Sequence, residues 1–413
     1  MSLTKVSYSM VTGAPVNVLD YGADPTGVIN SSAAINAAIV AGAGGTIYIP
    51  TGVYKCNTPI LFQTANTQLI GDGASTVLWG NHTGTVLEVL PTAGLLTSVT
   101  ISKLVCWSPT GAGFKVSQTI NSNFVDLWAY SSKIGFTLLN QVQGCTFDRL
   151  IFSSNVAGAF TTRYPVLPGV TSTDAGIFLS DSGTVSNSNI FNAPIVEGAG
   201  SHGIAIWGLH VGTTIMHPLS EGNAGYGFSI RGITGLATGL KLINAYTEAN
   251  TLGSALIQGQ SLMSLDNCTF GAAADATISL TLVSNSSVTN SSCYSAIEDA
   301  TSFGNVYSNF TTTTTFSRLG WLYPLTVNSA TPSIQYYGAA FKTINYLATI
   351  YTDFTGGYAG QSIQVFIRDA NTTVNFTSGS LKGNSGVDWI PINGDWMDCT
   401  YDGTYWYCSV NNT

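Results

Sequence analysis

The stretch Gly176-Ile177-Phe178-Leu179 is one copy of a pattern in which a glycine is followed by an apolar, a variable and an apolar residue. Related stretches begin at Gly113, Gly135, Gly158 (without the last apolar residue), Gly203 and Gly227, and looser copies without the glycine begin at Ser254 and Thr277. Successive copies start 18 to 27 residues apart, which gives a period near 23. Short alternating strands at such a period indicate a solenoid in which each repeat forms one coil. We therefore predict an all-β fold built on a single-stranded parallel β-helix of about eight coils.

The composition suits stacked coils and argues against two kinds of partner. Only 8% of the 413 residues are charged, and a surface with so few charges favours self-association. The net charge of −8 and the 13 Lys and Arg argue against nucleic-acid binding, which depends on basic groups that release counterions. The first residues lack the apolar core of a secretory signal, and no stretch reaches the roughly 18 apolar residues of a membrane helix. We expect no nucleic-acid partner, no membrane insertion and no cleaved leader.

The seven cysteines have neither metal-binding nor disulfide spacing. They are scattered from Cys56 to Cys408 without a C-x-x-C pair, so we expect buried thiols, no metal site and no cofactor. Cys399 and Cys408 flank Asp402-Gly403, which has the composition of a tight hairpin turn. With a two-residue turn Cys399 would face Trp406, so a disulfide to Cys408 would be out of register and we do not expect one.

Three regions are expected along the chain. Residues 1–55 form an N-terminal segment and capping module, in which Ser31 or Ser32 starts a short helix over the open end of the first coil. Residues 56–310 form the β-helix. Residues 311–413 begin with a run of five threonines, which is typical of a linker, and continue as an aromatic-rich antiparallel β-sandwich.

The N-terminal module resembles that of a known superfamily. The stretch from Asn17 to Asp24, the short helix after it and the stretch from Gly44 to Tyr54 are similar to the opening of the pectate-lyase superfamily of right-handed parallel β-helices, in particular to bacteriophage tailspike and tail-fibre proteins. The resemblance implies a right-handed coil and a homotrimer in the virion, at the phage tail, with other tail or baseplate proteins as partners. It also implies extracellular action on a bacterial surface polysaccharide, and a C-terminal module that serves in trimerisation or carbohydrate binding.

A column of three glutamates is the first candidate for a catalytic site. Counting seven residues back from the first apolar residue of each repeat gives Trp107, Ala129, Phe152, Val170, Glu197, Glu221, Glu248 and Gly271. Adjacent strands lie about 4.8 Å apart, so Glu197, Glu221 and Glu248 would stack at distances that bracket the carboxylate separations of glycosidases. Repulsion among them would raise at least one pKa, as a general acid requires. The same glutamates also suit plain polar turns, with Asn223 and Asn250 forming a ladder at the corner.

A second candidate lies on the turn after the repeat strand. Its members are Asp181, with Asp174 as the alternative carboxylate, and the substrate-binding residues Trp207, His210, His217, Tyr226 and Arg231. The segment 161–173 interrupts the regular spacing, and we expect it to form a loop beside them. Aromatic and arginine side chains next to an irregular loop suit sugar stacking and hydroxyl recognition. A polar turn with one exposed tryptophan is the simpler alternative.

These features favour a depolymerase that cleaves a capsule, O-antigen or exopolysaccharide by glycoside hydrolysis. A polysaccharide lyase acting on a uronate-containing glycan is the main alternative, because Arg163, Tyr164 and His217 could supply the base and the cation that it needs. The basic residues in the coils, which include Lys103 and Arg149, are not expected to cluster. A non-catalytic receptor-binding or structural virion fibre is the third possibility.

Overall fold

The computed structural model describes residues 13–131, 133–154, 174–232, 237–271, 277–298, 302, 305–313, 316–318, 323–334 and 340–413. The chain divides into two compact units, one of residues 1–297 with 307–317 and the other of residues 298–306 with 318–413. In the described part of the chain, none of the helices has the length and apolar character needed to cross a membrane.

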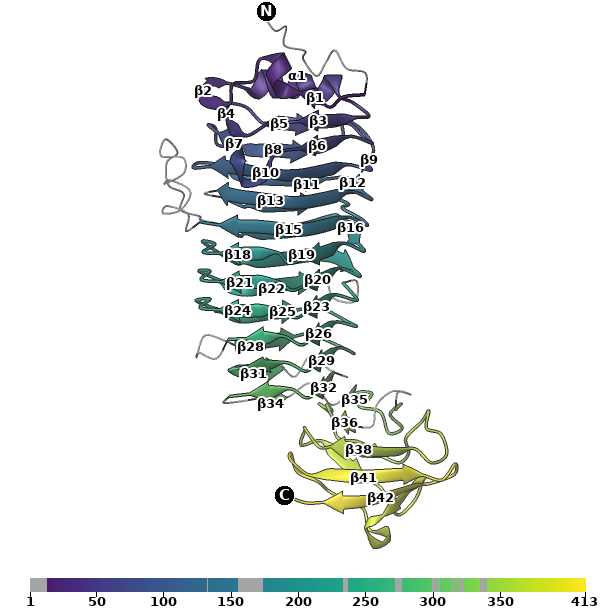
Figure 1. The fold of residues 1–413 in the computed structure, drawn as a ribbon. Helices are drawn as coiled ribbons and strands as arrows, with labels where there is room; N and C mark the ends of the chain where they lie inside the picture. The colour runs from purple at the N-terminus through teal and green to yellow at the C-terminus, as the bar shows by residue number, and fades with distance from the viewer. Residues whose placement is uncertain are drawn as a thin grey trace, which may run out of the picture. The chain divides into compact units, whose positions relative to one another are not determined.

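The first unit is a parallel β-helix whose coils contribute strands to three ladders, named here sheets I, II and III (Figure 1). Sheet I consists of β5 (Ile60–Phe62), β8 (Thr85–Val89), β11 (Ala112–Ser117), β14 (Phe136–Leu139), β16 (Ile177–Asn187), β19 (Ile204–Val211), β22 (Tyr226–Gly232), β25 (Gly253–Gln258), β28 (Thr277–Thr281), β31 (Ser295–Glu298) and β34 (Phe316–Arg318). Sheet II consists of β1 (Val16–Asn17), β3 (Thr46–Tyr48), β6 (Gln68–Ile70), the first halves of β10 (Thr100–Ser108), β13 (Asn123–Ser131) and β15 (Thr146–Ser153), then β17 (Ile190–Asn192), β20 (Thr214–Met216), β23 (Lys241–Ile243), β26 (Ser264–Asp266), β29 (Ser287–Thr289) and β32 (Val306–Ser308).

Sheet III follows sheet II within each coil. It consists of β2 (Thr26–Asn30), β4 (Gly52–Cys56), β7 (Thr76–Gly80), the second halves of β10, β13 and β15, then β18 (Ile195–Glu197), β21 (Leu219–Glu221), β24 (Tyr246–Glu248), β27 (Thr269–Phe270), β30 (Ser292–Cys293) and β33 (Thr311–Thr312). Short strands β9 (Leu96–Thr97) and β12 (Thr119–Ile120) pair at another corner. The threonines of β33, which we expected in a linker, therefore belong to the β-helix.

The glycine repeat marks the sheet I strands, as predicted. The residue after each glycine pairs in register with its counterparts, in the order Phe114, Phe136, Ile177, Ile204, Phe228, Ala255 and Ile278. Phe136 pairs directly with Ile177, so the copy expected at Gly158 adds no strand between β14 and β16, and that part of the prediction was wrong. Gly158 itself lies outside the described residues. Sheet I has eleven strands, more than the eight expected, because the first and last coils lack the glycine pattern.

In-register pairing stacks equivalent side chains inside the coil. Phe124, Phe147 and Phe191 come from three successive coils, and their ring centroids lie 4.9 and 4.6 Å apart in nearly parallel planes. These rings belong to one apolar core that runs from the capping helix to the last described coils. Because each coil is too thin to bury its own apolar face, its stability depends on the coils on either side.

A helix covers the first coil, as predicted. The helix α1 (Ser32–Ala41) contributes its apolar face to the core, next to the short 3-10 helix η2 (Val18–Tyr21). The side chain of Ser31 does not cap α1, because its hydroxyl accepts a hydrogen bond from the Asp24 backbone N–H at 2.9 Å. Asn30 takes that role, since its Oδ1 accepts from the Ser32 N–H at 3.1 Å.

A buried asparagine ladder closes the corner between sheets III and I. Asn223 Nδ2 donates to Asn250 Oδ1 at 2.7 Å, and Asn223 Oδ1 accepts from the Ala199 N–H at 2.9 Å. Asn250 Nδ2 in turn donates to the Ser220 carbonyl at 3.0 Å. The ladder predicted for these two asparagines is confirmed, and it satisfies backbone groups that the turn would otherwise leave unpaired inside the protein.

The second unit is a small β-structure with its own core around Trp406. Its main sheet has the order β35 (Tyr323–Pro324), β36 (Ala340–Lys342), β38 (Ser362–Phe366), β41 (Trp396–Tyr401), β42 (Trp406–Asn411) and β40 (Leu381–Gly383), and β37 (Thr349–Tyr351) pairs with β39 (Thr372–Val374). The expected antiparallel pairing holds for the central strands β38, β41 and β42, whereas the outer pairs are parallel. The predicted fold class, a parallel β-helix with an N-terminal capping helix and a C-terminal β-unit, is confirmed.

A disulfide joins Cys399 and Cys408, which we did not expect. The two residues pair directly across β41 and β42, with their Cα atoms 4.1 Å apart. The connection is longer than a two-residue turn, because Tyr401 pairs with Trp406. Within it the Asp402 carboxylate accepts hydrogen bonds from the Thr404 and Tyr405 N–H groups. The longer loop shifts the register by the amount that brings the two sulfurs together.

Replacing Asn223 with alanine should lower the free energy of unfolding by about 1–3 kcal/mol, because the buried Ala199 N–H would lose its acceptor and Asn250 Oδ1 would lose its side-chain donor. Asn81→Ala is the matched control, since it removes only an exposed side-chain bond to Asn57 and should change stability by roughly 0.5 kcal/mol or less. Urea denaturation followed by tryptophan fluorescence measures both. Equal effects of the two substitutions would contradict a structural role for the ladder.

Candidate functional site

The three predicted glutamates stand in register at the ends of β18, β21 and β24. Glu197 pairs with Glu221, and Glu221 pairs with Glu248, as the repeat spacing predicted. Neighbouring strands are about 4.8 Å apart, so each carboxylate has a like charge roughly one strand away. The residue before each glutamate is buried, so the glutamate points to the outer face of sheet III. We call these three residues the Glu ladder.

The backbone after each glutamate explains why the strand ends there. Gly198, Gly222 and Ala249 all have positive φ values, 68°, 62° and 53°. The left-handed conformation turns the chain out of sheet III toward sheet I, and it favours glycine because a Cβ atom is strained there. The Glu-Gly sequence in two of the three coils is therefore a local requirement of the corner, whereas the carboxylate itself is not.

The middle member of the Glu ladder has the perturbed electrostatics. Partial burial and then the charges of Glu197 and Glu248 raise the pKa of Glu221 above its usual value. At the end of the ladder Glu248 Oε2 accepts a hydrogen bond of 2.7 Å from the Tyr246 hydroxyl, which raises the pKa of that tyrosine. A carboxyl of raised pKa beside a hydrogen-bonded carboxylate is the combination used in acid–base catalysis.

Toward the N-terminus the column contains Trp107, as predicted, but otherwise has different residues from those we expected. Glu197 pairs with Ser153, and before it come Tyr130, Trp107 and Trp79. Ala129 and Phe152 were placed in this column wrongly: they pair with Cys106 and Val196 and point into the core. The first apolar residue of the next sheet I strand, Phe136, follows Tyr130 by six residues and not by seven, so counting back seven gives the wrong residue in that coil. The expected Val170 lies outside the described residues.

These aromatic residues pack against one another, so they do not present exposed ring faces on which a ligand could stack. Trp107 and Tyr130 are only 3% and 8% exposed, and with three valines they form a second apolar cluster on the outer face of sheet III. Trp107 stacks on Trp79 with ring centroids 6.1 Å apart. Burial and then the charge of Glu197 raise the pKa of Tyr130 to about 12, so the field of the Glu ladder reaches this cluster.

The second candidate is an aromatic cluster on the outer face of sheet I. Arg231 lies over the Trp207 ring with its Cζ 4.9 Å from the centroid, and Trp207 Nε1 donates to the Ser229 hydroxyl at 3.2 Å. His202 lies between Trp207 and Tyr226, with ring centroids 6.0 and 5.8 Å away. Its Nδ1 accepts from the Tyr226 N–H at 3.1 Å, and burial and then Arg231 lower its pKa. The cluster and the Glu ladder are on different sheets.

Other predicted members do not join this cluster. His210 is 3% exposed and its Nε2 lies 2.8 Å from the Trp207 carbonyl, so it cannot contact a glycan from this position and its predicted binding role was wrong. His217 lies at the bend between sheets II and III, 3.0 Å from Asn244 Nδ2. Asp174 is exposed and its carbonyl accepts from the Ser201 N–H at 3.3 Å. Asp181 pairs with Gly208 through its backbone, and its side chain lies outside the described residues, as do residues 161–173.

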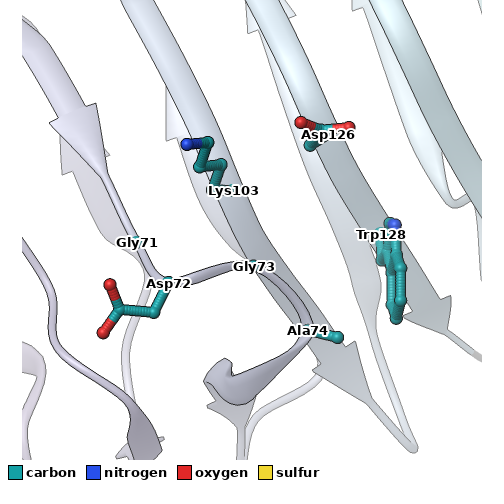
Figure 2. Close-up of a pocket in the computed structure, with 7 residues that line it drawn as sticks. All are labelled: Gly71, Asp72, Gly73, Ala74, Lys103, Asp126 and Trp128. Carbon is teal, nitrogen blue, oxygen red and sulfur yellow. The ribbon is translucent and has the colours of Figure 1, made fainter.

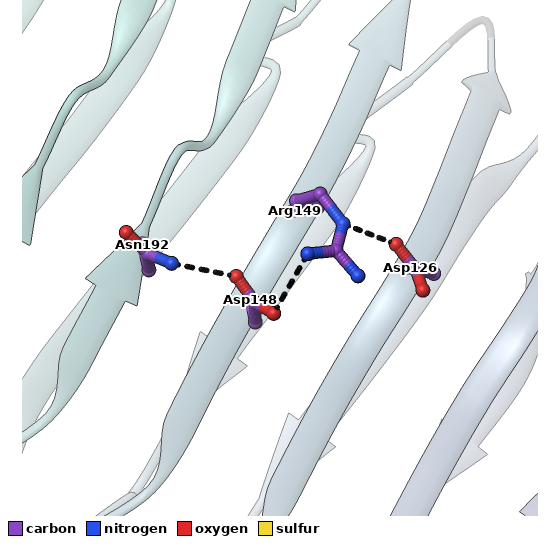
Figure 3. A network of polar contacts seen from close by, with 4 residues as sticks. All are labelled: Asp126, Asp148, Arg149 and Asn192. Carbon is purple, nitrogen blue, oxygen red and sulfur yellow. Dashed lines mark hydrogen bonds and ion pairs between the residues drawn. The ribbon is translucent and has the colours of Figure 1, made fainter.

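Sequence reasoning missed a charged network at the bend between sheets II and III. Asp126 accepts a hydrogen bond from Arg149 Nε, and Arg149 Nη1 lies 3.2 Å from Asp148 Oδ2 (Figure 3). Asn192 Nδ2 donates to Asp148 Oδ1 at 2.8 Å. Lys103 lies next to Asp126 at the same bend, in the preceding coil. The hydrogen bond from Arg149 is the main cause that lowers the pKa of Asp126.

The signal for this network was present in the repeat period. Lys103, Asp126 and Arg149 are spaced 23 residues apart and all adopt positive φ, from 53° to 59°. Our expectation that the basic residues of the coils do not cluster was therefore wrong for Lys103 and Arg149. Applying the period to every charged residue, and not only to the glutamates, would have found the column.

Comparison with known proteins identifies the family. Residues 15–249 match the family described as rhamnogalacturonase A/epimerase, pectate lyase-like. The chain belongs to this family. The resemblance noted in the N-terminal module is thereby confirmed at the level of the superfamily, and no curated protein sequence matches the chain.

Two solved structures share the family fold at low sequence identity. The A-module of mannuronan C-5 epimerase AlgE4 from Azotobacter vinelandii is 14% identical, with a TM-score of 0.51 over 74% of this chain and 98% of that one. The gp42 tailspike of Acinetobacter phage vb_AbaP_AS12 is 12% identical, with a TM-score of 0.51 over 91% of this chain and 64% of that one. Both likenesses concern the fold.

Glu221→Gln should stabilise the protein near neutral pH, because it removes a charge that the folded state disfavours. The pKa of Glu221 is higher in the folded than in the unfolded chain, so its ionisation weakens the fold as pH rises through that interval. The gain should be roughly 0.5 kcal/mol or less, since the ladder is partly solvated, and it should vanish below the usual glutamate pKa of about 4.3.

Thermal unfolding at several pH values measures this effect. Glu88→Gln is the matched control, because Glu88 lies 3.6 Å from Lys115 and loses an attraction, so it should not stabilise. A Glu221→Gln variant that is no more stable than the original chain near neutral pH would mean that the ladder charges do not interact.

Proposed function

We propose that the protein is a phage tailspike-like depolymerase that binds and cleaves a bacterial surface glycan, a capsule, O-antigen or exopolysaccharide, by glycoside hydrolysis. The observation that carries the proposal is the Glu ladder, in which Glu221, whose pKa is raised, stands between two other glutamates on an outer face of the β-helix. Hydrolysis of a glycosidic bond needs one carboxylic acid and one carboxylate on either side of that bond.

In the proposed mechanism Glu221 is the general acid, because it is the member of the ladder whose pKa is raised, by partial burial and by its two glutamate neighbours. Glu248 is the proposed nucleophile, and the hydrogen bond from the Tyr246 hydroxyl holds its carboxylate in place. Neighbours about 4.8 Å apart match the separation of about 5–5.5 Å in retaining enzymes. Glu248 attacks the anomeric carbon while Glu221 protonates the leaving oxygen, and water then releases the sugar from Glu248.

The phage setting and the trimer are parts of the same proposal. The fold shared with a phage tailspike and the N-terminal resemblance to tailspike and tail-fibre proteins support a place in the virion and extracellular action on the host. A surface with only 8% charged residues supports burial of part of it between three copies, with other tail or baseplate proteins as further partners.

A polysaccharide lyase is the second candidate, and the cluster on sheet I favours it. Arg231 could neutralise a uronate carboxylate, and the Tyr226 hydroxyl or the neutral His202 could act on the adjacent proton. The Nδ1 atom of His202 is already an acceptor for the Tyr226 N–H, so its Nε2 carries the proton in the neutral ring and cannot be the base in this tautomer. Hydrolysis on the Glu ladder is therefore the stronger proposal.

Glu221→Gln should reduce cleavage by about 10²–10⁴-fold, because general acid catalysis contributes that much. Glu248→Gln should reduce it at least as far, while Glu88→Gln on sheet I should leave it unchanged. Release of reducing ends from purified capsular and O-antigen polysaccharides measures the rate, and proton NMR of the first product shows whether the anomeric configuration is retained.

The other candidate functions give different results in the same assay. A lyase releases products with a carbon–carbon double bond and ultraviolet absorbance, and Glu221→Gln would leave that rate unchanged. A pure binding fibre releases no reducing ends from any glycan that it binds. Full cleavage by a folded Glu221→Gln variant would remove the Glu ladder from the mechanism.

The trimer can be tested without a substrate. Light scattering coupled to size-exclusion chromatography should give a mass about three times the 43.2 kDa of one chain, because the neutral surface needs partners. A mass of one chain at the working concentration would contradict the trimer but would leave the proposed cleavage site untouched.

A further inference from the structure

A cleft outside both candidate sites lies at the bend between sheets II and III (Figure 2). It has a volume of about 440 Å³, and it is lined by the loop of residues 71–74, by Lys103 and Asp126 at the bend, and by Trp128 on the outer face of sheet III. This volume can accommodate one sugar ring. An indole beside a few polar groups is the usual composition of a carbohydrate subsite.

The loop wall of the cleft is fixed by its own hydrogen bonds. The Gly71 N–H donates to the Ser102 carbonyl at 3.0 Å, and a Cβ atom on Gly71 would lie 2.3 Å from the Lys103 carbonyl, so only glycine permits this approach. The Asp72 carboxylate accepts from the Tyr48 hydroxyl at 2.9 Å and from the Thr51 N–H at 2.9 Å. It points away from Trp128 (Figure 2), so Asp72 braces the wall and does not face a ligand stacked on that ring.

Two charged groups of opposite sign face the cleft. Arg149 bonds to Oδ1 of Asp126 and keeps this carboxylate ionised, which leaves Oδ2 as an acceptor for a ligand. In the part of the chain that the structure describes, Lys103 Nζ forms neither an ion pair nor a side-chain hydrogen bond, and the residue is exposed. The cleft therefore offers a strong donor and a strong acceptor from neighbouring strands.

The bend that carries Lys103 and Asp126 has the same backbone conformation in successive coils. Equivalent positions in later coils are occupied by Asn244, Asn267 and Asn290, which adopt positive φ with little strain. The earlier coils place Lys103 and Asp126 in the same conformation, at φ of 59° and 54°. Ala193 and His217 share this conformation in the coils between, so the corner requires it and leaves the side chain free to vary.

We propose that this cleft binds a neutral pyranose, with the apolar face of the ring on the Trp128 indole and its hydroxyls bonded to Lys103 and Asp126. A hydroxyl can both accept from the ammonium and donate to the carboxylate, so it satisfies both groups at once. A carboxylated sugar would meet the Asp126 charge, and an amino sugar would meet Lys103 and Arg149. The local charges of Lys103 and Arg149 are balanced by Asp126 and Asp148, which suits an uncharged ligand.

The cleft can hold a part of the glycan that is remote from any cleaved bond. Trp128 pairs with Ile151, and Ile151 pairs with Ile195, which precedes Glu197 by two residues on the same outer face. The cleft is thus two strands from the Glu ladder along sheet III. Binding in the cleft does not require the proposed hydrolysis, so the two proposals can fail separately.

The test is binding of single sugars to the full chain. Saturation-transfer NMR with glucose, galactose, mannose, rhamnose and N-acetylglucosamine should detect at least one that binds, and a crystal soaked with it should show the ring on Trp128. Trp128→Ala and Lys103→Met should each weaken this binding by about tenfold or more. Glucuronate and galacturonate should bind at least about tenfold more weakly than the neutral sugar.

Controls separate loss of the cleft from loss of the fold. Lys241→Met replaces another exposed lysine of the coils and should leave binding unchanged. Trp128→Phe keeps an aromatic ring in place and should retain part of the affinity if Trp128→Ala does not fold. Glu221→Gln should bind the sugar as before even though cleavage is lost. No binding of any neutral sugar, tighter binding of a uronate, or binding unchanged in Lys103→Met and in Trp128→Phe would overturn the proposal.

Discussion

Parallel pairing in constant register is the constraint on which this β-helix depends. Each coil returns the chain to the same position one strand spacing away, so every side chain lies against its equivalents in the coils before and after it. Inside, this turns single phenylalanines into the stack of Phe124, Phe147 and Phe191. At the corner it turns Asn223 and Asn250 into a hydrogen-bonded ladder. Outside, it brings charges together whether they attract or repel.

The same rule produces opposite electrostatics in two columns. Glu197, Glu221 and Glu248 repeat one sign, so proton affinity rises at the middle member. Lys103, Asp126 and Arg149 alternate in sign, so the central carboxylate is held ionised. Both of these columns lie along sheet III or its bend, whereas Glu88 and Lys115 form a charge pair on sheet I. This concentration of interacting charge is the physical basis for looking for glycan chemistry on this side of the coil.

The sequence predicted what depends on the repeat and missed what depends on corner length. The strands of sheet I and the register of the Glu ladder follow from the period, and the capping helix follows from the local helix signals of the N-terminal module. Ala129 was misplaced because the corner after Tyr130 is one residue shorter than the corners after the glutamates. Phe152 was misplaced because residues 155–173 interrupt the regular spacing after it. Counting back from the glycine of each repeat detects neither change in length. The Cys399–Cys408 bond was missed for the same reason, since the loop between its strands is longer than the turn signal indicates. The burial of His210 depends on packing across coils, which no local pattern reports.

The corner after Ser154 has a further consequence. The strands on either side of residues 155–173 pair as if that segment were not there, because β14 joins β16 while β15 joins β17 and β18. The Ser154 N–H also bonds to the Glu197 carbonyl, which fastens the exit point to the next coil. The register of the core on both sides is therefore independent of how many residues separate Ser154 from Asp174. A β-helix of this kind can lengthen one of its corners in sequence without repacking its interior.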